Sequence, residues 1–213
     1  WAQGRVNSTF SRYSRVRSMT GMTGAEAARR LLNAQGIYDV TVQQIAGELT
    51  DHYDPRTKTV NLSQSVYGAT SVAAIGVAAH ECGHAMQDNE GYAPLRFRSA
   101  LVPVANFGSS LSWPLILLGL VFGGLGSPLV EIGILMFSLA VLFQLVTLPV
   151  EYNASARAVR LLDAQGILAG EEVNGTRKVL NAAALTYVAA AATSILQLLR
   201  LIILFGGRNR RDR

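Results

Sequence analysis

The segment His80-Glu81-Cys82-Gly83-His84 combines residue types that could do metal chemistry. It matches the pattern H-E-x-x-H and uses two of only three histidines in the chain. In a helix over residues 71–87, the four-residue spacing places both imidazoles on one face, where they can share an ion. Zinc held by two imidazoles and a carboxylate retains a position for water and lowers that water's pKa to about 7. Glu81 is then placed to take the proton; the alternative is a helix with two ordinary histidines.

The residues around this segment are unusually small. They are Ala73, Ala74, Gly76, Ala78, Ala79, Gly83 and Ala85. Each internal glycine costs a helix roughly 1 kcal/mol relative to alanine, so a close approach of another backbone is expected in return. That second element would supply the remaining ligand, although a generic tight contact between helices would also use small residues.

The third ligand is not evident from the motif itself. The longer pattern H-E-x-x-H-x-x-G-x-x-H fails, because Gln87 replaces its glycine and Glu90 its third histidine. A peptide-deformylase arrangement needs an upstream cysteine ligand, which the chain lacks, so a carboxylate from a second element is the remaining choice. Glu151 begins an alanine-lined segment that could lie against the small-sided helix, and Glu90 is the second candidate. The competing interpretation of Glu151 is a charge that marks a membrane boundary.

Three long uncharged runs follow the motif. They lie between Arg98 and Glu131, over residues 132–150, and between Lys178 and Arg200. About 20 apolar residues cross a hydrocarbon core of roughly 30 Å, so each run is long enough to span a membrane. A glycine- and proline-containing turn over residues 123–128 predicts a transmembrane hairpin over residues 103–150. A buried helix of a soluble protein explains one such run, but it explains three in a chain of 213 residues poorly.

The chain is basic, with a formal net charge of +5 and a pI near 9.7. No nucleic-acid motif accompanies these charges, and they flank apolar runs, which favours anionic lipid headgroups over nucleic acid as the partner. Four arginines crowd residues 208–213 and four more lie in a basic arm over residues 5–17. Because the chain starts at Trp1, we expect a signal sequence or a membrane anchor upstream.

The region before the motif predicts a helix over residues 25–35 that ends at Gly36. An extended stretch begins at Val40, a short helical turn covers residues 43–47, and residues 49–53 and 58–62 form a β-hairpin. This hairpin is the candidate to receive a substrate backbone as an added strand. His52 lies on this hairpin. It is a candidate third metal ligand or oxyanion donor, and the alternative is an ordinary surface histidine. Residues 30–37 recur almost unchanged as residues 160–167, which predicts two similarly capped helices.

Several motifs together resemble the YugP-type neutral zinc metallopeptidases of bacterial membranes. They are Asp51-His52-Tyr53-Asp54-Pro55, Ala78 to Ala85, Gly91-Tyr92-Ala93-Pro94-Leu95 and the segment that begins at Glu151. The chain is also distantly similar to HtpX-type membrane proteases, which place a transmembrane hairpin between the histidine helix and an E-x-x-x-D ligand helix. The resemblance implies that His80, His84 and Glu151 bind zinc and that Glu81 is the base, as in a gluzincin. Ser155 stands where the HtpX pattern has aspartate.

The expected fold is mainly α with a small β-hairpin: a zincin-like peptidase domain joined to a transmembrane helical bundle. The expected parts are residues 1–100 (basic arm, helix, hairpin and motif helix), 101–150 (transmembrane hairpin), 151–178 (second part of the peptidase domain, with the third ligand) and 179–213 (a membrane-associated helix and basic tail). The expected activity is zinc-dependent hydrolysis of peptide bonds in membrane or membrane-proximal proteins. His52, Tyr152 and Arg157 are candidate donors to the oxyanion.

A non-catalytic membrane scaffold or adaptor tied together by zinc is the alternative function. Such structural sites are usually closed by a fourth protein ligand, and the chain supplies only three good ones. We expect a multi-pass protein of the bacterial inner membrane whose partners are the lipid bilayer, a peptide or membrane-protein substrate and a regulatory membrane protein. Charge counts favour a cytoplasmic catalytic face, although the basic tail competes for the same side.

Overall fold

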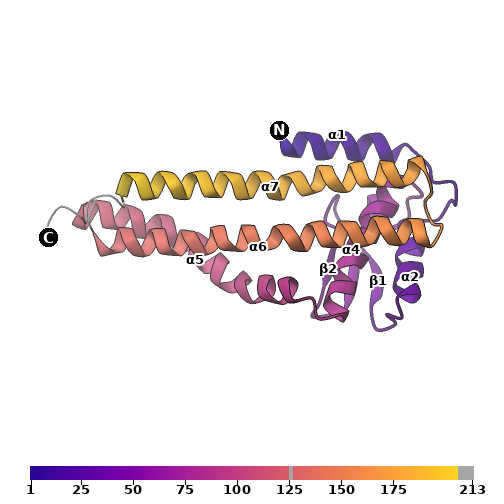
Figure 1. Ribbon diagram of the computed structural model, residues 1–213, viewed down its shortest axis with the longest axis horizontal. Coiled ribbons are helices and arrows are strands. Elements are labelled where there is room, and N and C mark those ends of the chain that lie inside the picture. The colour runs from indigo at the N-terminus through magenta and orange to yellow at the C-terminus, as the bar shows by residue number, and fades with distance from the viewer. Residues whose placement is uncertain (125–126, 206–213) are drawn as a thin grey trace. The chain divides into compact units, whose positions relative to one another are not determined.

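The computed structural model describes residues 1–124 and 127–205. Most of this part is helical, with one small sheet (Figure 1). The chain forms two compact units: the first joins Trp1–Tyr92 to Val150–Thr186, and the second joins Ala93–Pro149 to the chain from Tyr187 on. Helices α6 (Pro128–Ala164) and α7 (Glu171–Phe205) each contribute residues to both units.

The first unit contains a three-stranded sheet in the order β1-β3-β2. Strands β2 (His52–Asp54) and β3 (Thr59–Ser63) pair antiparallel, which confirms the predicted hairpin with slightly shifted bounds. The helical turn predicted for residues 43–47 is wrong, because β1 (Thr41–Ile45) is a strand that pairs parallel to β3. β-branched residues prefer extended backbone, and the distant partner β3 supplies the hydrogen bonds that make the strand stable.

Two helices of the first unit end in the same way, as their matching sequences predict. Helix α2 (Gly24–Ala34) begins with a capping box between Thr23 and Glu26 and is followed by Gly36 at φ 68°. The α6 helix is followed by Gly166 at φ 62°. In each case the next residue, Ile37 or Ile167, donates its N–H back to a leucine carbonyl five residues earlier. The left-handed glycine allows this closure without the penalty that a Cβ would bring.

Helix α4 (Val72–Asn89) forms the centre of the first unit, as the predicted helix over residues 71–87 requires. Its N-cap is Ser71, whose hydroxyl accepts the N–H of Ala74. One side packs on α2, and the short helix α3 (Gln64–Tyr67) and the sheet also contact it. Helix α1 (Ala2–Ser14) contains the first part of the basic arm and contacts α4 as well.

The small residues of α4 allow another backbone to approach, as the sequence predicts. A Cβ built on Gly83 would lie 2.6 Å from the carbonyl oxygen of Ala154 in α6. A Cβ on Gly76 would lie 2.9 Å from a side-chain atom of Thr176 in α7. The absence of a side chain at Gly83 therefore allows the backbone of α6 at Ala154 to lie close to the histidine helix.

The substitution Gly83→Ala is expected to destabilise the protein. Overpacking against a backbone atom costs about 1–3 kcal/mol, which exceeds the roughly 1 kcal/mol that alanine gains in a helix. Thermal unfolding of the detergent-solubilised protein, followed by circular dichroism, measures the effect. The matched control is Gly4→Ala in α1, where the added Cβ meets no atom within 4 Å and the unfolding midpoint should stay or rise. Equal midpoints for wild type and Gly83→Ala would contradict the packing argument.

Three helices are long and apolar enough to cross a membrane, judged by length and composition. They are α5 (Ala93–Gly123), α6 and α7, with mean hydropathies of 1.5, 2.3 and 2.1 in their most apolar windows. Within the second unit α5 and α6 pack through glycines: a Cβ on Gly108 would lie 2.7 Å from the carbonyl oxygen of Met136. Small residues of this kind let membrane helices approach closely.

The predicted turn between the first two runs lies partly within the described residues. Gly124 has φ 71°, and its carbonyl accepts the N–H of Ser127. Helix α5 begins at Ala93, ahead of the uncharged run, and accommodates both Pro103 and Pro114. The arginines of residues 208–213 lie outside the described residues.

Candidate metal centre

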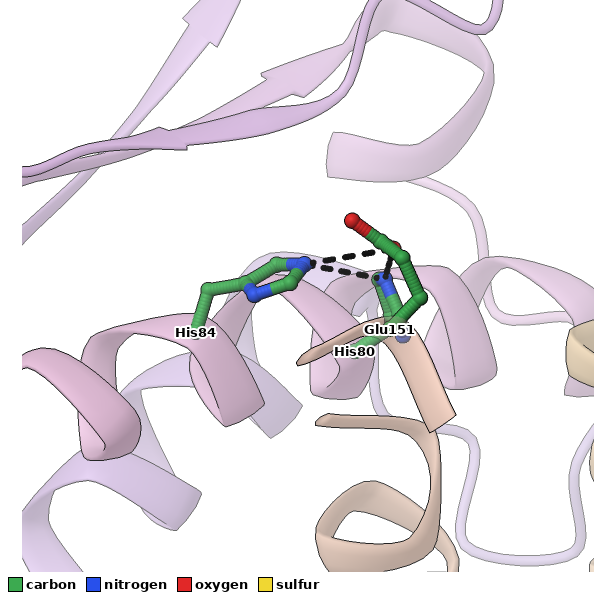
Figure 2. A group of neighbouring side chains, drawn as sticks. All are labelled: His80, His84 and Glu151. Atoms are coloured by element: carbon green, nitrogen blue, oxygen red, sulfur yellow. Dashed lines mark hydrogen bonds and ion pairs between the residues drawn. The ribbon is translucent and has the colours of Figure 1, made fainter. Parts of the chain in front are cut away.

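Two helices of the first unit bring the motif histidines and Glu151 together. His80 and His84 lie on one face of α4, one turn apart, with ring centroids 4.7 Å apart. Glu151 lies on α6, near the point where that helix enters the first unit. Figure 2 shows the carboxylate pointing at both imidazoles. The three residues form a group that could hold a metal ion, and it is the only group of its kind among the described residues.

The distances within this group suit a single tetrahedral ion. His80 Nε2 lies 3.2 Å from His84 Nε2 and 3.2 Å from Glu151 Oε2, and His84 Nε2 lies 3.6 Å from the same oxygen. Zinc bonds of about 2.0–2.2 Å in tetrahedral geometry separate ligand atoms by about 3.3 Å. Nitrogen and carboxylate oxygen are also donors that zinc accepts. The group therefore fits a zinc ion in both chemistry and spacing.

The carboxylate of Glu151 is buried, and a buried charge needs a partner. Glu151 is only 3% exposed and His84 is also buried. An ionised carboxylate out of water is costly unless it is paired or binds a cation. A boundary charge at a membrane surface would not be enclosed in this way, so the boundary interpretation of Glu151 does not account for its position.

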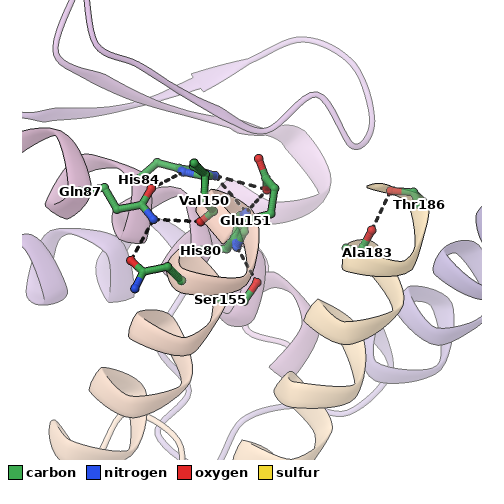
Figure 3. Close-up of polar contacts among 9 residues, drawn as sticks. His80, His84, Gln87, Val150, Glu151, Ser155, Ala183 and Thr186 are labelled. Carbon is green, nitrogen blue, oxygen red and sulfur yellow. Dashed lines mark hydrogen bonds and ion pairs between the residues drawn. The ribbon is translucent and has the colours of Figure 1, made fainter. Parts of the chain in front are cut away.

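Gln87 determines which nitrogen of His84 carries the proton. Its amide Nε2 faces two acceptors, the Val150 carbonyl at 2.9 Å and Asn153 Oδ1 at 3.0 Å (Figure 3). Its Oε1 must therefore face His84 Nδ1, at 3.0 Å, and accept a hydrogen from it. With the proton on Nδ1, the lone pair of Nε2 points into the three-residue group.

The orientation of the Gln87 amide is itself held by a chain of hydrogen bonds. Arg157 Nε donates to Asn153 Oδ1 at 2.7 Å, which leaves that oxygen facing Gln87 as an acceptor. Arg157 Nη1 in turn pairs with Glu90 at 2.6 Å. The bond from Gln87 to the Val150 carbonyl also ties α4 to the residue before Glu151. One buried side chain therefore orients a histidine and holds the carboxylate's helix in place.

The surroundings of the His84 imidazole favour its protonated form more than water does. Burial lowers the pKa of this imidazole, but the hydrogen bond to Glu151, the charges of Glu81 and Glu151, and the hydrogen bond to Gln87 together raise the pKa above its usual value. The charges of Glu81 and Glu151 that help to raise this pKa would also attract a metal ion. A metal ion would compete with that proton for the same nitrogen.

Ser155 and Glu81 complete the surroundings. The Ser155 hydroxyl lies 3.1 Å from His80 Nδ1, one helical turn after Glu151, so serine makes the contact where aspartate would be expected in the HtpX pattern. Glu81 is 8% exposed and has no hydrogen bond or ion pair to another residue within 1–124 and 127–205. Its carboxylate is thus not committed to a structural partner in the described chain.

The other sequence candidates lie elsewhere. The exposed carboxylate of Glu90 pairs with Arg157 instead of joining the histidines. His52 contacts the carbonyl of Thr50 through Nδ1 and the Asn61 amide through Nε2, on the edge of the sheet. Tyr152 lines a groove beside α1. The structure therefore brings Glu151, and neither Glu90 nor His52, to the motif histidines.

Sequence reasoning missed Gln87 and Asn153 as members of the site. Gln87 was visible only as a departure from the longer histidine pattern. Its position three residues after His84 was a usable signal, because such residues are neighbours on a helix. Asn153 had no comparable signal, since its contact crosses from α6 to α4.

The candidate metal site and the membrane-length helices together indicate the class of protein. A two-histidine, one-carboxylate group that could bind a metal ion lies in a chain with three helices long enough to span a membrane. The chain belongs to the family described as "Putative neutral zinc metallopeptidase", which matches residues 1–206. It is 50% identical over 205 residues to "Putative membrane protease YugP" of Bacillus subtilis (strain 168), an alignment that covers 96% of this chain and 90% of that protein. No solved structure matches the chain.

The substitution Gln87→Met tests whether Gln87 positions His84. Methionine keeps roughly the volume of the side chain but removes every hydrogen bond, so zinc affinity is expected to fall by about 10–100-fold. Competition with a fluorescent chelator measures the affinity. The exposed Gln35→Met variant is the control. A drop in the thermal stability of the metal-free protein with unchanged zinc affinity would show that Gln87 is only structural.

Proposed function

We propose that this chain is a membrane-embedded zinc-dependent endopeptidase with an H-E-x-x-H plus glutamate site of the gluzincin kind. One observation carries the proposal: a buried carboxylate 71 positions from His80 in the chain converges with the two motif imidazoles at the spacing that one zinc ion requires. The family membership and the membrane protease named at 50% identity support the same activity.

His80 Nε2, His84 Nε2 and one oxygen of Glu151 would hold the ion. When bound, zinc supplies Lewis-acid polarisation of the scissile carbonyl and lowers the pKa of water to about 7. Glu81 accepts a proton from the attacking water and delivers it to the leaving amine nitrogen. The carbon–oxygen bond forms, the carbon–nitrogen bond breaks, and the carboxylate is regenerated.

The edge strand β2 is the proposed receptor for the substrate backbone. It has β3 on one side only, so its other edge can pair with an extended peptide. Asp88 of α4 ties the hairpin to the motif helix. Its carboxylate accepts hydrogen bonds from the Tyr53 hydroxyl of β2 and from the Lys58 ammonium group, at 2.8 Å each. An added peptide strand would therefore be positioned relative to the helix that carries the histidines.

We place the protein in the bacterial inner membrane as a multi-pass protein with a cytoplasmic catalytic face. Three candidate spans, and the basic residues Arg160, Arg177 and Lys178 in the first unit, support this placement. Its partners are the bilayer, a peptide or membrane-protein substrate and a regulatory membrane protein, without nucleic acid. Labelling of exposed Tyr38→Cys with a membrane-impermeant maleimide tests the side: labelling in intact cells would contradict a cytoplasmic face.

Removal of the metal distinguishes a peptidase from a scaffold in which zinc only holds the helices together. Treatment with a zinc chelator is expected to abolish cleavage of casein or of a membrane-protein substrate, and added zinc should restore it. The three residues of the site leave a position for water, whereas a structural site is usually closed by a fourth protein ligand. A chelator that melts the fold, with no proteolysis before its addition, would instead favour the scaffold.

A further inference from the structure

A groove of about 790 Å³ lies in the first unit, apart from the metal group. Helix α1 and the first turns of α7 form its walls, and Tyr152 of α6 also lines it. The two helices run in opposite directions here (Figure 1). They touch at Tyr13 and Gly175, where a Cβ on the glycine would lie 2.7 Å from the tyrosine ring.

The wall formed by α1 is a single helical stripe. Arg5, Ser8, Thr9 and Arg12 follow the spacing i, i+3, i+4, i+7, which places them on one face. A helix that packs on its neighbours normally turns an apolar stripe of this kind toward them. In α1 the stripe consists of two guanidinium groups and two hydroxyls, and the Tyr13 ring continues it.

The wall formed by α7 has the same spacing, and its side chains change from polar to apolar along the helix. Lys178 and Asn181 are polar, whereas Ala182 and Leu185 are apolar. The uncharged run of α7 extends from residue 179 to residue 199. Because the helices are antiparallel and touch at Tyr13 and Gly175, Arg12 and Lys178 lie toward one end of the groove, whereas Arg5 lies toward the end with the apolar Ala182 and Leu185.

Three cations share this groove without an acidic partner. Among the described residues, no aspartate or glutamate lines it and no ion pair involves Arg5, Arg12 or Lys178. The two guanidinium groups lie over aromatic rings: Arg5 over Trp1 and Arg12 over Tyr13, each 5.8 Å from the ring centre. Like charges in one concavity repel each other, and a bound anion would relieve that repulsion.

We propose that this groove binds the phosphate headgroup of an anionic phospholipid. Arginine and lysine are the side chains that recognise phosphate, and the hydroxyls and the Asn181 amide add donors around them. The acyl chains would leave past Ala182 and Leu185, alongside an apolar helix. A soluble phosphate would not use those apolar contacts, and this distinguishes a lipid from an inorganic ion.

Equilibrium binding to the full chain in uncharged detergent micelles tests the proposal. The probe is phosphatidylglycerol with a fluorescent acyl chain, compared with phosphatidylcholine carrying the same label. The triple variant Arg5→Gln, Arg12→Gln, Lys178→Gln is expected to bind phosphatidylglycerol about 100-fold more weakly, at about fivefold per basic residue. The control triple variant Arg15→Gln, Arg17→Gln, Arg56→Gln removes the same charge from exposed positions outside the groove and should change affinity less than twofold.

Two further variants and two competing ligands complete the experiment. The charge-preserving variant Arg5→Lys, Arg12→Lys should fold and bind nearly as wild type, and Lys178→Gln alone should lose about fivefold. Equal binding of the two lipids, or equal losses in the two triple variants, would overturn the proposal. Displacement by millimolar inorganic phosphate would reassign the groove to a soluble anion. Displacement by a polyglutamate peptide at the lipid's own concentration would reassign it to an acidic protein segment.

Discussion

Peptide hydrolysis is expected to fall by about 10²–10⁴-fold in Glu81→Gln, while the zinc content of the protein stays at the wild-type level. The amide has the shape of the carboxylate but cannot accept a proton from water. Glu81 makes no hydrogen bond or ion pair elsewhere in the described chain, so the substitution removes no structural contact recorded there. Zinc is held by other residues under the proposed mechanism, and the metal should remain.

The measurement needs both a rate and a metal assay on the same preparation. Cleavage of a fluorogenic casein substrate gives the rate, and elemental analysis gives the zinc stoichiometry. The matched control is Glu48→Gln, an equally conservative change at an exposed position, for which both values should be unchanged. Undiminished proteolysis in Glu81→Gln would remove the base from the proposed mechanism.

Zinc affinity is expected to fall by more than about 100-fold in Glu151→Ala. Loss of a residue that only supports a ligand already costs about 10–100-fold, and Glu151 would itself be a ligand. The alanine leaves two imidazoles with Nε2 atoms 3.2 Å apart and no carboxylate between the helices. Activity should disappear together with the metal, in contrast to Glu81→Gln, where only activity disappears.

Dialysis against a graded zinc buffer, followed by elemental analysis, measures this effect. Glu90→Ala is the informative comparison, because its carboxylate pairs with Arg157 at the exposed end of the hydrogen-bond chain that leads to Gln87. Its effect on zinc affinity should be small. An unchanged zinc stoichiometry in Glu151→Ala, or a loss confined to Glu90→Ala, would contradict the proposed ligand set.

Neutral side chains contact both motif histidines. The Ser155 hydroxyl lies 3.1 Å from His80 Nδ1. His84 receives a neutral support from Gln87, oriented by Asn153 and Arg157. A neutral acceptor leaves an imidazole less basic than a carboxylate would, while it still selects the tautomer.

The local features of this protein followed from the sequence alone because their causes are local. The four-residue spacing of His80 and His84 places them on one face of any helix that contains both. Gly36 and Gly166 end their helices through their own backbone freedom. The membrane-length helices follow from the length of the uncharged runs, and the tight approach at Gly83 follows from the absence of a side chain.

Only the tertiary structure decided which distant groups meet. Glu90 is closer to His84 in sequence than Glu151 is, yet packing of α6 on Gly83 brings Glu151 to the imidazoles. Strand β1 was misassigned because its hydrogen bonds come from β3, and parallel pairing joins segments without a short-range signal. The direction of the Gln87 amide likewise depends on α6. Sequence periodicity determines the face on which a side chain lies, but the opposing partner depends on how helices pack over long separations.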